Sequence, residues 1–277
     1  MKTVILPGGE RVPAFGLGTW NVGDHRAARA EEIATLRLGL DLGARLIDTA
    51  EMYGDGRAEE LIAEAIAGRR DEVFLVSKVY PHNASARGLP AACERSLRRL
   101  QSDRIDLYLL HWRGTVPLAE TLQALLRLRQ AGKIRHFGVS NLDSADLQEL
   151  WRLPGGEGVA TNQLLYNLTR RGIEWDLLPW MRARRVPLMA YSPLEQARIV
   201  DHPKLAAFAE RHGMTAAQAA LAWLLARDDV IVIPKTSRRA RLKENLAALD
   251  TALTAAQLAE LDRLFPPPGG ATALEML

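Results

Sequence analysis

Short apolar runs alternate with helical patterns along almost the entire chain. The apolar runs have the length of β-strands and lie near residues 14–18, 45–48, 73–77, 106–110, 136–140, 159–163, 187–191 and 230–233. Helical patterns lie between or after them, near 27–42, 57–67, 88–100, 117–131, 143–151, 173–184, 203–227 and 238–247. The pattern over 203–227 predicts two helices, at 203–212 and 215–227. Strands that alternate with helices are typical of parallel sheets. Eight such units predict an α/β fold, a (β/α)8 TIM barrel, in which residues 1–277 form a single domain.

Two segments lie outside the eight repeats. Residues 3–13 are predicted to form an N-terminal β-hairpin around Pro7-Gly8-Gly9, and residues 254–264 an extra C-terminal helix. A doubly wound open sheet is the alternative to the barrel. It is disfavoured because the Gly-x-Gly-x-x-Gly signature that should follow its first strand has Asn21 in place of the last glycine. Helix caps are expected at Gly43, Gly68, Gly132, Asp143 and Thr215.

Single polar residues stand at the ends of three consecutive apolar runs. Asp48, Lys78 and His111 end the second, third and fourth runs, and Tyr53 lies five residues beyond Asp48 in a glycine-rich segment. The carboxyl ends of the strands of such a barrel meet at one mouth. Because neighbouring strands lie about 4.8 Å apart, we expect these four side chains to be close enough to touch.

These four residue types suit the reduction of a carbonyl group. The Tyr53 phenol, with an ordinary pKa of about 10, is expected to have a lower pKa beside the Lys78 ammonium. Asp48 would keep that lysine charged, and the phenol could give a proton to the developing alkoxide. A neutral His111 could orient the carbonyl oxygen or take part in proton transfer. The hydride would come from elsewhere.

Each of these residues alone also has an ordinary structural interpretation. Asp48 could cap a turn, Lys78 could belong to a buried ion pair, and His111 could be a core histidine. Lys78 could also form a Schiff base, although that chemistry would not need Tyr53. The joint arrangement on consecutive strand ends favours a catalytic site. No metal is expected, because the strand ends carry no His-x-His pair or carboxylate cluster, and no Gly-x-Ser-x-Gly elbow appears.

Composition narrows the class of protein further. Of the 277 residues, 48% are hydrophobic and 25% are charged, which favours a sizeable core over disorder. The net charge of +3 is too small to argue for nucleic acid. Cys93, the only cysteine, excludes an internal disulfide and is expected to be a buried structural thiol. Without a signal-peptide core at the N-terminus or an apolar run of ~20 residues, a cytoplasmic location without membrane contact is expected.

The chain resembles the aldo-keto reductase family over nearly its whole length. The motifs that carry the resemblance are Gly16-Leu17-Gly18-Thr19-Trp20, Ile47-Asp48-Thr49-Ala50, Asp106-Leu107-Tyr108-Leu109-Leu110-His111-Trp112, Gly138-Val139-Ser140-Asn141, Ala190-Tyr191-Ser192-Pro193-Leu194 and Ile233-Pro234-Lys235. The family's catalytic tetrad corresponds to Asp48, Tyr53, Lys78 and His111 without a substitution. Bacterial members that reduce methylglyoxal and other small aldehydes look most similar, through Glu51-Met52-Tyr53, Ser77-Lys78-Val79-Tyr80-Pro81 and Leu153-Pro154-Gly155-Gly156.

The resemblance implies NADPH-dependent reduction of aldehydes and ketones to alcohols. The expected substrates are small aldehydes, methylglyoxal-like dicarbonyls and aromatic aldehydes, with Tyr53 as general acid and base. In the family the nicotinamide of NADPH or NADP stacks on an aromatic ring, here Tyr191. Its carboxamide is held by residues that correspond to Ser140, Asn141 and Gln163. Further cofactor contacts are expected from Ser192, Leu194 and, at the pyrophosphate or ribose, Asp24.

A second group of residues suits a phosphate. Hydroxyls and cations follow the strand at 230–233 and precede a helix, where unpaired backbone donors and the positive end of the helix dipole favour an anion. The resemblance places the 2′-phosphate of NADP here, so NADPH should be preferred to NADH. A solvated basic helix start is the alternative. The residues concerned are Lys235, Thr236, Ser237, Arg238 and Arg241, with Glu244 and Asn245 near the adenine.

Trp20 and Trp112 both follow strands and are expected to wall the pocket for a small carbonyl substrate. The connection after Tyr191 and the tail after Pro268 are shorter than in the larger animal members of the family. These short segments imply an open pocket and faster exchange of the cofactor. The protein is expected to be a monomer.

Two other functions compete with carbonyl reduction. The family includes channel-associated members that bind the nucleotide and turn over poorly, so a regulatory subunit is one alternative, which the intact tetrad disfavours. Nucleic-acid binding is the other, through scattered arginine pairs that are more typical of a solvated surface. These pairs are Arg98-Arg99, Arg170-Arg171, Arg184-Arg185 and Arg238-Arg239.

Overall fold

A computed structural model describes residues 2–277 of the chain. Its main sheet has eight parallel strands, β3 (Gly16–Gly18), β4 (Leu46–Asp48), β5 (Phe74–Val79), β6 (Ile105–Leu110), β7 (Ile134–Ser140), β8 (Asn162–Leu165), β9 (Leu188–Tyr191) and β10 (Val230–Val232). The strands pair in sequence order from β3 to β10. Parallel bridges join Phe15 to Val232 and Gly18 to Lys235, so the first strand meets the last. The predicted (β/α)8 barrel is therefore confirmed.

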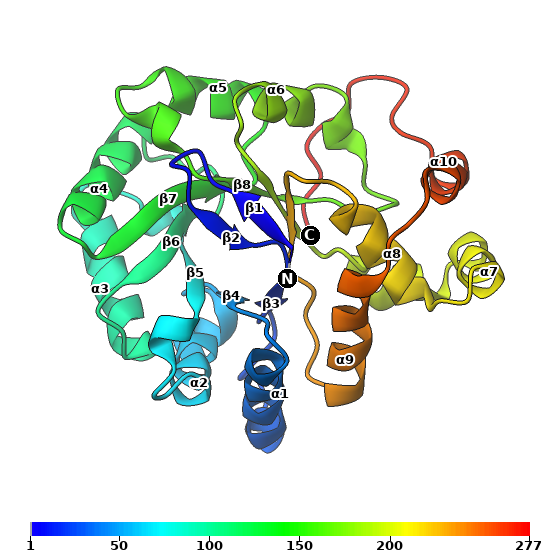
Figure 1. Ribbon diagram of the computed structural model, residues 1–277. Coiled ribbons are helices and arrows are strands. Elements are labelled where there is room, and N and C mark those ends of the chain that lie inside the picture. The colour runs from blue at the N-terminus through cyan, green and yellow to red at the C-terminus, as the bar shows by residue number, and fades with distance from the viewer. Residues whose placement is uncertain (1) are drawn as a thin grey trace.

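Helices surround the barrel as an outer layer (Figure 1). They are α1 (Arg29–Asp41), α2 (Arg57–Ala65), α3 (Gly88–Leu100), α4 (Leu118–Gln130), α5 (Ser144–Arg152), α6 (Leu177–Ala183), α7 (Pro203–Arg211), α8 (Ala216–Leu225), α9 (Arg239–Ala247) and α10 (Ala255–Leu264). Both α7 and α8 lie in the connection between β9 and β10. The helix α10 is the extra C-terminal helix that the sequence predicts, and it packs against α7. None of the helices within residues 2–277 is both long and apolar enough to cross a membrane.

An antiparallel hairpin of β1 (Thr3–Ile5) and β2 (Arg11–Pro13) precedes the barrel. Figure 1 shows it crossing the front of the barrel. Glu10, next to β2, contacts Arg135 at 2.8 Å and the His136 ring nitrogen at 2.7 Å. Both partners lie near the start of β7, so the hairpin covers the N-terminal end of the barrel and leaves the opposite end as the mouth.

The element positions agree with the sequence prediction except at two places. The strand β8 begins at Asn162 rather than at 159, because its pairing with β9 starts only there. The helix expected over 173–184 is interrupted at Asp176, whose carboxylate accepts the Leu177 N–H and starts α6.

The predicted caps and the predicted state of the cysteine are confirmed. The Asp143 carboxylate accepts two backbone N–H groups at the start of α5, and Thr215 forms a capping box at the start of α8. Cys93 is fully buried and forms no disulfide. The backbone takes positive φ at the three predicted glycine caps, Gly43, Gly68 and Gly132.

Candidate active site

The four residues predicted to form a catalytic site meet at the mouth of the barrel. Asp48 is the last residue of β4, Lys78 lies near the end of β5, and His111 directly follows β6. Tyr53 lies in the turn after β4, where Gly54 has a φ of 57°. Such left-handed backbone is easiest for glycine, which accounts for the glycine-rich segment beside the tyrosine.

The Lys78 ammonium connects the carboxylate to the phenol. It donates to Asp48 Oδ2 at 2.8 Å, to the Thr49 carbonyl at 2.8 Å and to Tyr53 Oη at 3.2 Å. The exposed fraction is 0% for Lys78 and 2% for Asp48. A buried charge needs partners in this way because transfer from water is costly. The predicted contact between these strand ends is therefore present.

The pKa values of Lys78 and Tyr53 depend on the balance between burial and their charged neighbours, and that of Tyr53 differs from the sequence prediction. Burial lowers the pKa of Lys78, but Asp48 and Tyr53 more than compensate, so the net pKa is raised and the lysine stays charged. Burial raises the pKa of Tyr53, Lys78 lowers it, and the net direction is upward. The expected lowering of the Tyr53 pKa is therefore wrong, because loss of water outweighs the neighbouring ammonium. The phenol stays protonated at neutral pH.

His111 is a neutral imidazole beside the phenol. Burial and the positive charge of Lys78 lower its pKa to about 2, so the imidazole is neutral at neutral pH, the state considered from the sequence. Its ring centroid lies 5.9 Å from that of Tyr53, in an edge-on arrangement. A protonated phenol and a neutral imidazole side by side can both contact one carbonyl oxygen, the first as proton donor and the second as orienting partner.

The residues predicted to hold a carboxamide form a connected hydrogen-bond network. The Asn141 amide donates to Ser140 Oγ and to the His111 carbonyl, both at 3.2 Å. Tyr191 Oη donates to Asn141 Oδ1 at 3.0 Å. The Gln163 amide donates to Asp48 Oδ1 at 2.7 Å. This last bond, which the sequence did not predict, links the network directly to the carboxylate of the catalytic cluster.

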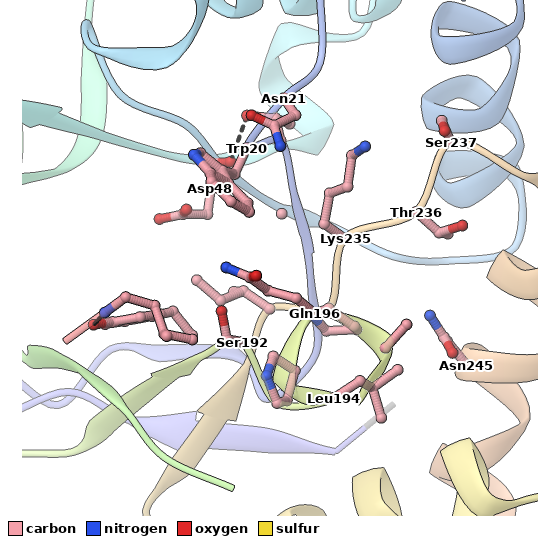
Figure 2. A pocket seen from close by; sticks show the side chains of 18 of the residues that line it. Trp20, Asn21, Asp48, Ser192, Leu194, Gln196, Lys235, Thr236, Ser237 and Asn245 are labelled. Carbon is pink, nitrogen blue, oxygen red and sulfur yellow. Dashed lines mark hydrogen bonds between the residues drawn. The ribbon is translucent and has the colours of Figure 1, made fainter. Parts of the chain in front are cut away.

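A cavity of about 780 Å³ opens at the mouth and extends away from the catalytic cluster. Asp48, Tyr53 and His111 line one end of the cavity. All the predicted cofactor residues between Ser140 and Asn245 also line it, but Asp24 does not. Figure 2 shows Ser192, Leu194 and Gln196 on one side, facing the segment of Lys235, Thr236 and Ser237. The volume is within the range of small-molecule and cofactor sites.

The far end of this cavity suits an anion. Within residues 2–277, the cations Lys235, Arg238 and Arg241 form no ion pair with a carboxylate. The neighbouring Arg239, which does not line the cavity, is paired with Glu31 at 2.8 Å. The Thr236 hydroxyl accepts from Arg238 N at 3.1 Å at the start of α9. Unpaired cations beside a helix start fit a phosphate group.

Two predicted contacts fall elsewhere in the structure. Asp24 does not line the cavity and lies 3.6 Å from an Arg57 nitrogen, which provides its charged partner. Trp112 does not line the cavity either, because its ring packs 4.8 Å from His111 and edge-on to Tyr80 at 5.9 Å. Trp20 does line the cavity, and 41% of its surface is exposed.

Several lining residues were not predicted from the sequence. Most of them lie in turns, at the start of α8 or at the end of the chain, where periodicity gives no signal. The tail after Pro268 is brief, yet it reaches the cavity, and the Leu277 N–H lies 3.4 Å from Tyr191 Oη. The short tail therefore contributes to the wall of the cavity, and the open pocket stays a prediction. The unpredicted lining residues include Asn21, Met52, Gln196, Ala216 and Leu277.

The barrel fold and the residues at its mouth are those of barrel oxidoreductases that act on carbonyl groups. The model of the Aldo/keto reductase family matches residues 14–265, which is most of the chain. The protein therefore belongs to the aldo/keto reductase family, and the predicted class of enzyme is confirmed. Within residues 2–277, no group of three or more His, Cys, Asp or Glu side chains is arranged to hold a metal ion.

Several bacterial proteins and solved structures are similar to this chain. Methylglyoxal reductase YeaE of Escherichia coli K12 is 50% identical to this chain, covering 100% of it and 99% of the relative. A crystal structure of an aldo/keto reductase from Klebsiella pneumoniae with NADP and acetate has a TM-score of 0.97 and 51% identity, with 100% and 99% covered. Another from that organism, with NADPH, has a TM-score of 0.96, 52% identity and the same coverage. Both hold the cofactor that the sequence predicts for this chain.

Proposed function

We propose that this protein reduces small aldehydes and dicarbonyl compounds to alcohols with NADPH. The observation that carries the proposal is the Tyr53 hydroxyl, held 3.2 Å from the buried Lys78 ammonium at one end of a cavity whose other end carries unpaired cations. This arrangement joins a proton donor to a site that fits a phosphorylated nucleotide. NADP and NADPH in the Klebsiella pneumoniae structures support the choice of cofactor.

The residues of the mouth divide the chemistry among them. NADPH, when bound, supplies the hydride. Tyr53 gives its proton to the carbonyl oxygen as that oxygen becomes an alkoxide, and Lys78 stabilises the resulting phenolate. Asp48 keeps the lysine charged and oriented. His111, neutral throughout, orients the carbonyl oxygen by a hydrogen bond.

The raised pKa of Tyr53 favours the direction of reduction. A phenol that is protonated at neutral pH is ready to donate to an alkoxide. Oxidation of an alcohol needs the phenolate instead, so that direction should become faster as the pH rises. The contact with Lys78 limits how far burial can raise the pKa.

The substrate end of the cavity suits a compact, uncharged carbonyl compound. Trp20 and Met52 border it together with Tyr53 and His111, and apolar and aromatic walls favour neutral ligands. The similarity to a methylglyoxal reductase supports a dicarbonyl substrate. We include aromatic aldehydes, which can stack on the Trp20 ring.

A steady-state panel tests the proposed substrate class. Consumption of NADPH would be followed at 340 nm with methylglyoxal, an aromatic aldehyde, an aldose sugar and a ketosteroid. We expect kcat/KM to be highest for the first two compounds. A strong preference for the steroid would contradict the assignment of a small substrate. Binding of NADPH without multiple turnover of any carbonyl compound would favour a nucleotide-binding regulatory subunit.

Arg241 and Arg239 form a matched pair for testing the phosphate site. Both are exposed and lie on α9, but only Arg241 lines the cavity, whereas Arg239 is paired with Glu31. A charge-assisted hydrogen bond contributes roughly 1.5–3 kcal/mol, so Arg241→Ala should raise the Kd of NADPH by about one to two decades. The Kd of NADH should change little. Fluorescence titration measures both.

The control variant Arg239→Ala should leave the Kd of NADPH and the Kd of NADH nearly unchanged. Equal weakening of NADPH and NADH binding by Arg241→Ala would mean that this arginine supports the adenine or the fold and does not contact the 2′-phosphate.

The arginine pairs considered for nucleic-acid binding argue against nucleic acid as a partner. Arg99 and Arg171 are bound to carboxylates of their own chain at 2.6 and 2.8 Å.

A further inference from the structure

One arginine bridges two segments that border the cavity from different parts of the chain. The Arg170 guanidinium donates to Glu195 Oε1 through Nε at 3.1 Å and through Nη2 at 2.9 Å. Its remaining nitrogen, Nη1, donates to Glu275 Oε1 at 2.6 Å. Glu195 belongs to the loop after β9, residues 192–201, which we name the cavity loop. Glu275 belongs to the segment 272–277, which we name the tail.

The conformation of the cavity loop depends on Glu195. That residue has a φ of 49°, and the next two, Gln196 and Ala197, have φ of 54° and 72°. Such left-handed backbone disfavours non-glycine residues, so it persists only where other contacts hold it. Glu195 is 5% exposed and also accepts from the Asn167 amide at 2.7 Å. This buried anchor therefore fixes the loop residues that line the cavity.

The tail is docked on the chain segment that carries Arg170. A Cβ atom at Gly172 would lie 2.4 Å from Thr272 Oγ1, so this glycine allows the tail to approach closely. From there the tail continues to the cavity, where Leu277 lies beside Tyr191. Glu275 itself does not line the main cavity. Its contact with Arg170 is thus its connection to the cofactor side of the molecule.

We propose that Arg170 is a positioning residue that couples the tail to the cavity loop and thereby slows release of the nucleotide. A guanidinium can hold two carboxylates at once because its donors form a rigid fork. When Glu275 holds one side of the fork, Arg170 remains directed at Glu195, and the cavity loop keeps its strained conformation. This inference rests on the proposed cofactor site and adds a control of its exchange.

The two arms of the bridge should differ in strength. The Glu195 side chain is 7% exposed, whereas that of Glu275 is 43% exposed. A buried charge-assisted contact matters more than an exposed ion pair, which water screens. We therefore expect loss of Arg170 to have a large effect on nucleotide release and loss of Glu275 to have a small effect of the same sign.

The rate of NADPH dissociation tests the coupling without requiring turnover. Stopped-flow fluorescence would follow displacement of NADPH by excess NADP. Arg170→Met keeps the aliphatic stem and should raise the dissociation rate roughly tenfold or more, since it removes charge-assisted bonds to Glu195. Glu275→Gln should raise it about twofold to fivefold, the range of an exposed ion pair.

A double variant and a control separate coupling from general loss of structure. Because Glu275 acts through Arg170, adding Glu275→Gln to Arg170→Met should change the rate no further. Arg198→Met removes a different contact to Glu195, at 2.9 Å, and leaves the tail arm intact, so Glu275→Gln should still have its effect in that background. Arg170→Lys keeps the charge but lacks the forked guanidinium. In that background Glu275→Gln should therefore not change the NADPH dissociation rate.

Specific results would overturn the coupling. An unchanged dissociation rate in Glu275→Gln, or simple addition of the two effects in the double variant, would show that the tail and the cavity loop act independently. Failure of NADPH to bind the unmodified protein would instead contradict the proposed function, so the two failures are distinguishable. Unchanged far-UV circular dichroism spectra of all variants at the assay temperature verify that the fold is intact.

Discussion

Two buried aspartates at opposite ends of the barrel have similar surroundings and different consequences. Asp106 lies near the start of β6, at the N-terminal end, and is 1% exposed. It accepts from the Leu75 N–H at 2.8 Å, from Arg70 at 2.8 Å and from Arg135 at 3.0 Å. Asp48, at the end of β4, is 2% exposed and accepts from a lysine and an amide. Both carboxylates are satisfied.

The two clusters differ in the groups that the partners of each carboxylate contact next. Arg135 continues to Glu10 beside the hairpin, so the Asp106 cluster fastens the hairpin to the barrel. Lys78 continues to Tyr53, which lines a cavity. A buried charge network therefore indicates chemistry only when it ends on a group that a ligand can reach. In barrels of this kind such groups gather at the carboxyl ends of the strands.

The largest effect is expected when the cavity-facing end of the Asp48 cluster is removed. Tyr53→Phe deletes only the hydroxyl, and loss of a general acid costs roughly 100- to 10,000-fold in rate. We expect kcat for methylglyoxal to fall by this factor while the Kd of NADPH and the unfolding temperature change little. Steady-state kinetics and fluorescence titration measure the two quantities.

A buried tyrosine on another strand of the barrel provides the matched control. Tyr108 lies on β6, is 0% exposed and does not line the cavity. Tyr108→Phe should leave kcat unchanged. Full activity of Tyr53→Phe would remove the basis for the proposed role of the phenol.

The next effect concerns stability and comes from the opposite end of the barrel. Asp106→Ala leaves the Leu75 N–H and the nearby arginines without their acceptor, and breaking such a buried pair costs about 3 kcal/mol. We expect the free energy of unfolding in urea to fall by about that amount, with kcat of the folded protein unchanged. Asp103→Ala is the control, since its pair with Arg104 is 81% exposed on the aspartate side and contributes little. Loss of kcat in a folded Asp106→Ala protein would contradict a purely structural role.

The sequence was informative where position along a strand decides position in space. The ends of three apolar runs were legible, and a barrel brings strand ends together, so the cluster of Asp48, Lys78 and His111 could be predicted. The direction of the Tyr53 pKa could not, because it depends on how deeply the phenol is buried. Contacts between distant loops were equally hidden: nothing in the spacing of Arg170 and Glu275 indicates that they meet.

The smallest expected effect tests the neutral state of His111 through the pH dependence of stability. Its pKa of about 2 in the folded protein lies below the ordinary value of about 6.5. Between these values the unfolded chain binds a proton that the folded protein does not, so folded-state stability falls as the pH falls below 6.5. The loss is about 1.4 kcal/mol per pH unit, or roughly 2 kcal/mol between pH 7 and pH 5.

His111→Gln keeps a polar side chain but cannot bind the proton. Urea unfolding at pH 7, 6 and 5 should therefore show the unmodified protein losing about 2 kcal/mol relative to this variant. Parallel stability curves for the two proteins would mean that His111 accepts a proton in the fold, and the neutral imidazole beside Tyr53 would have to be abandoned.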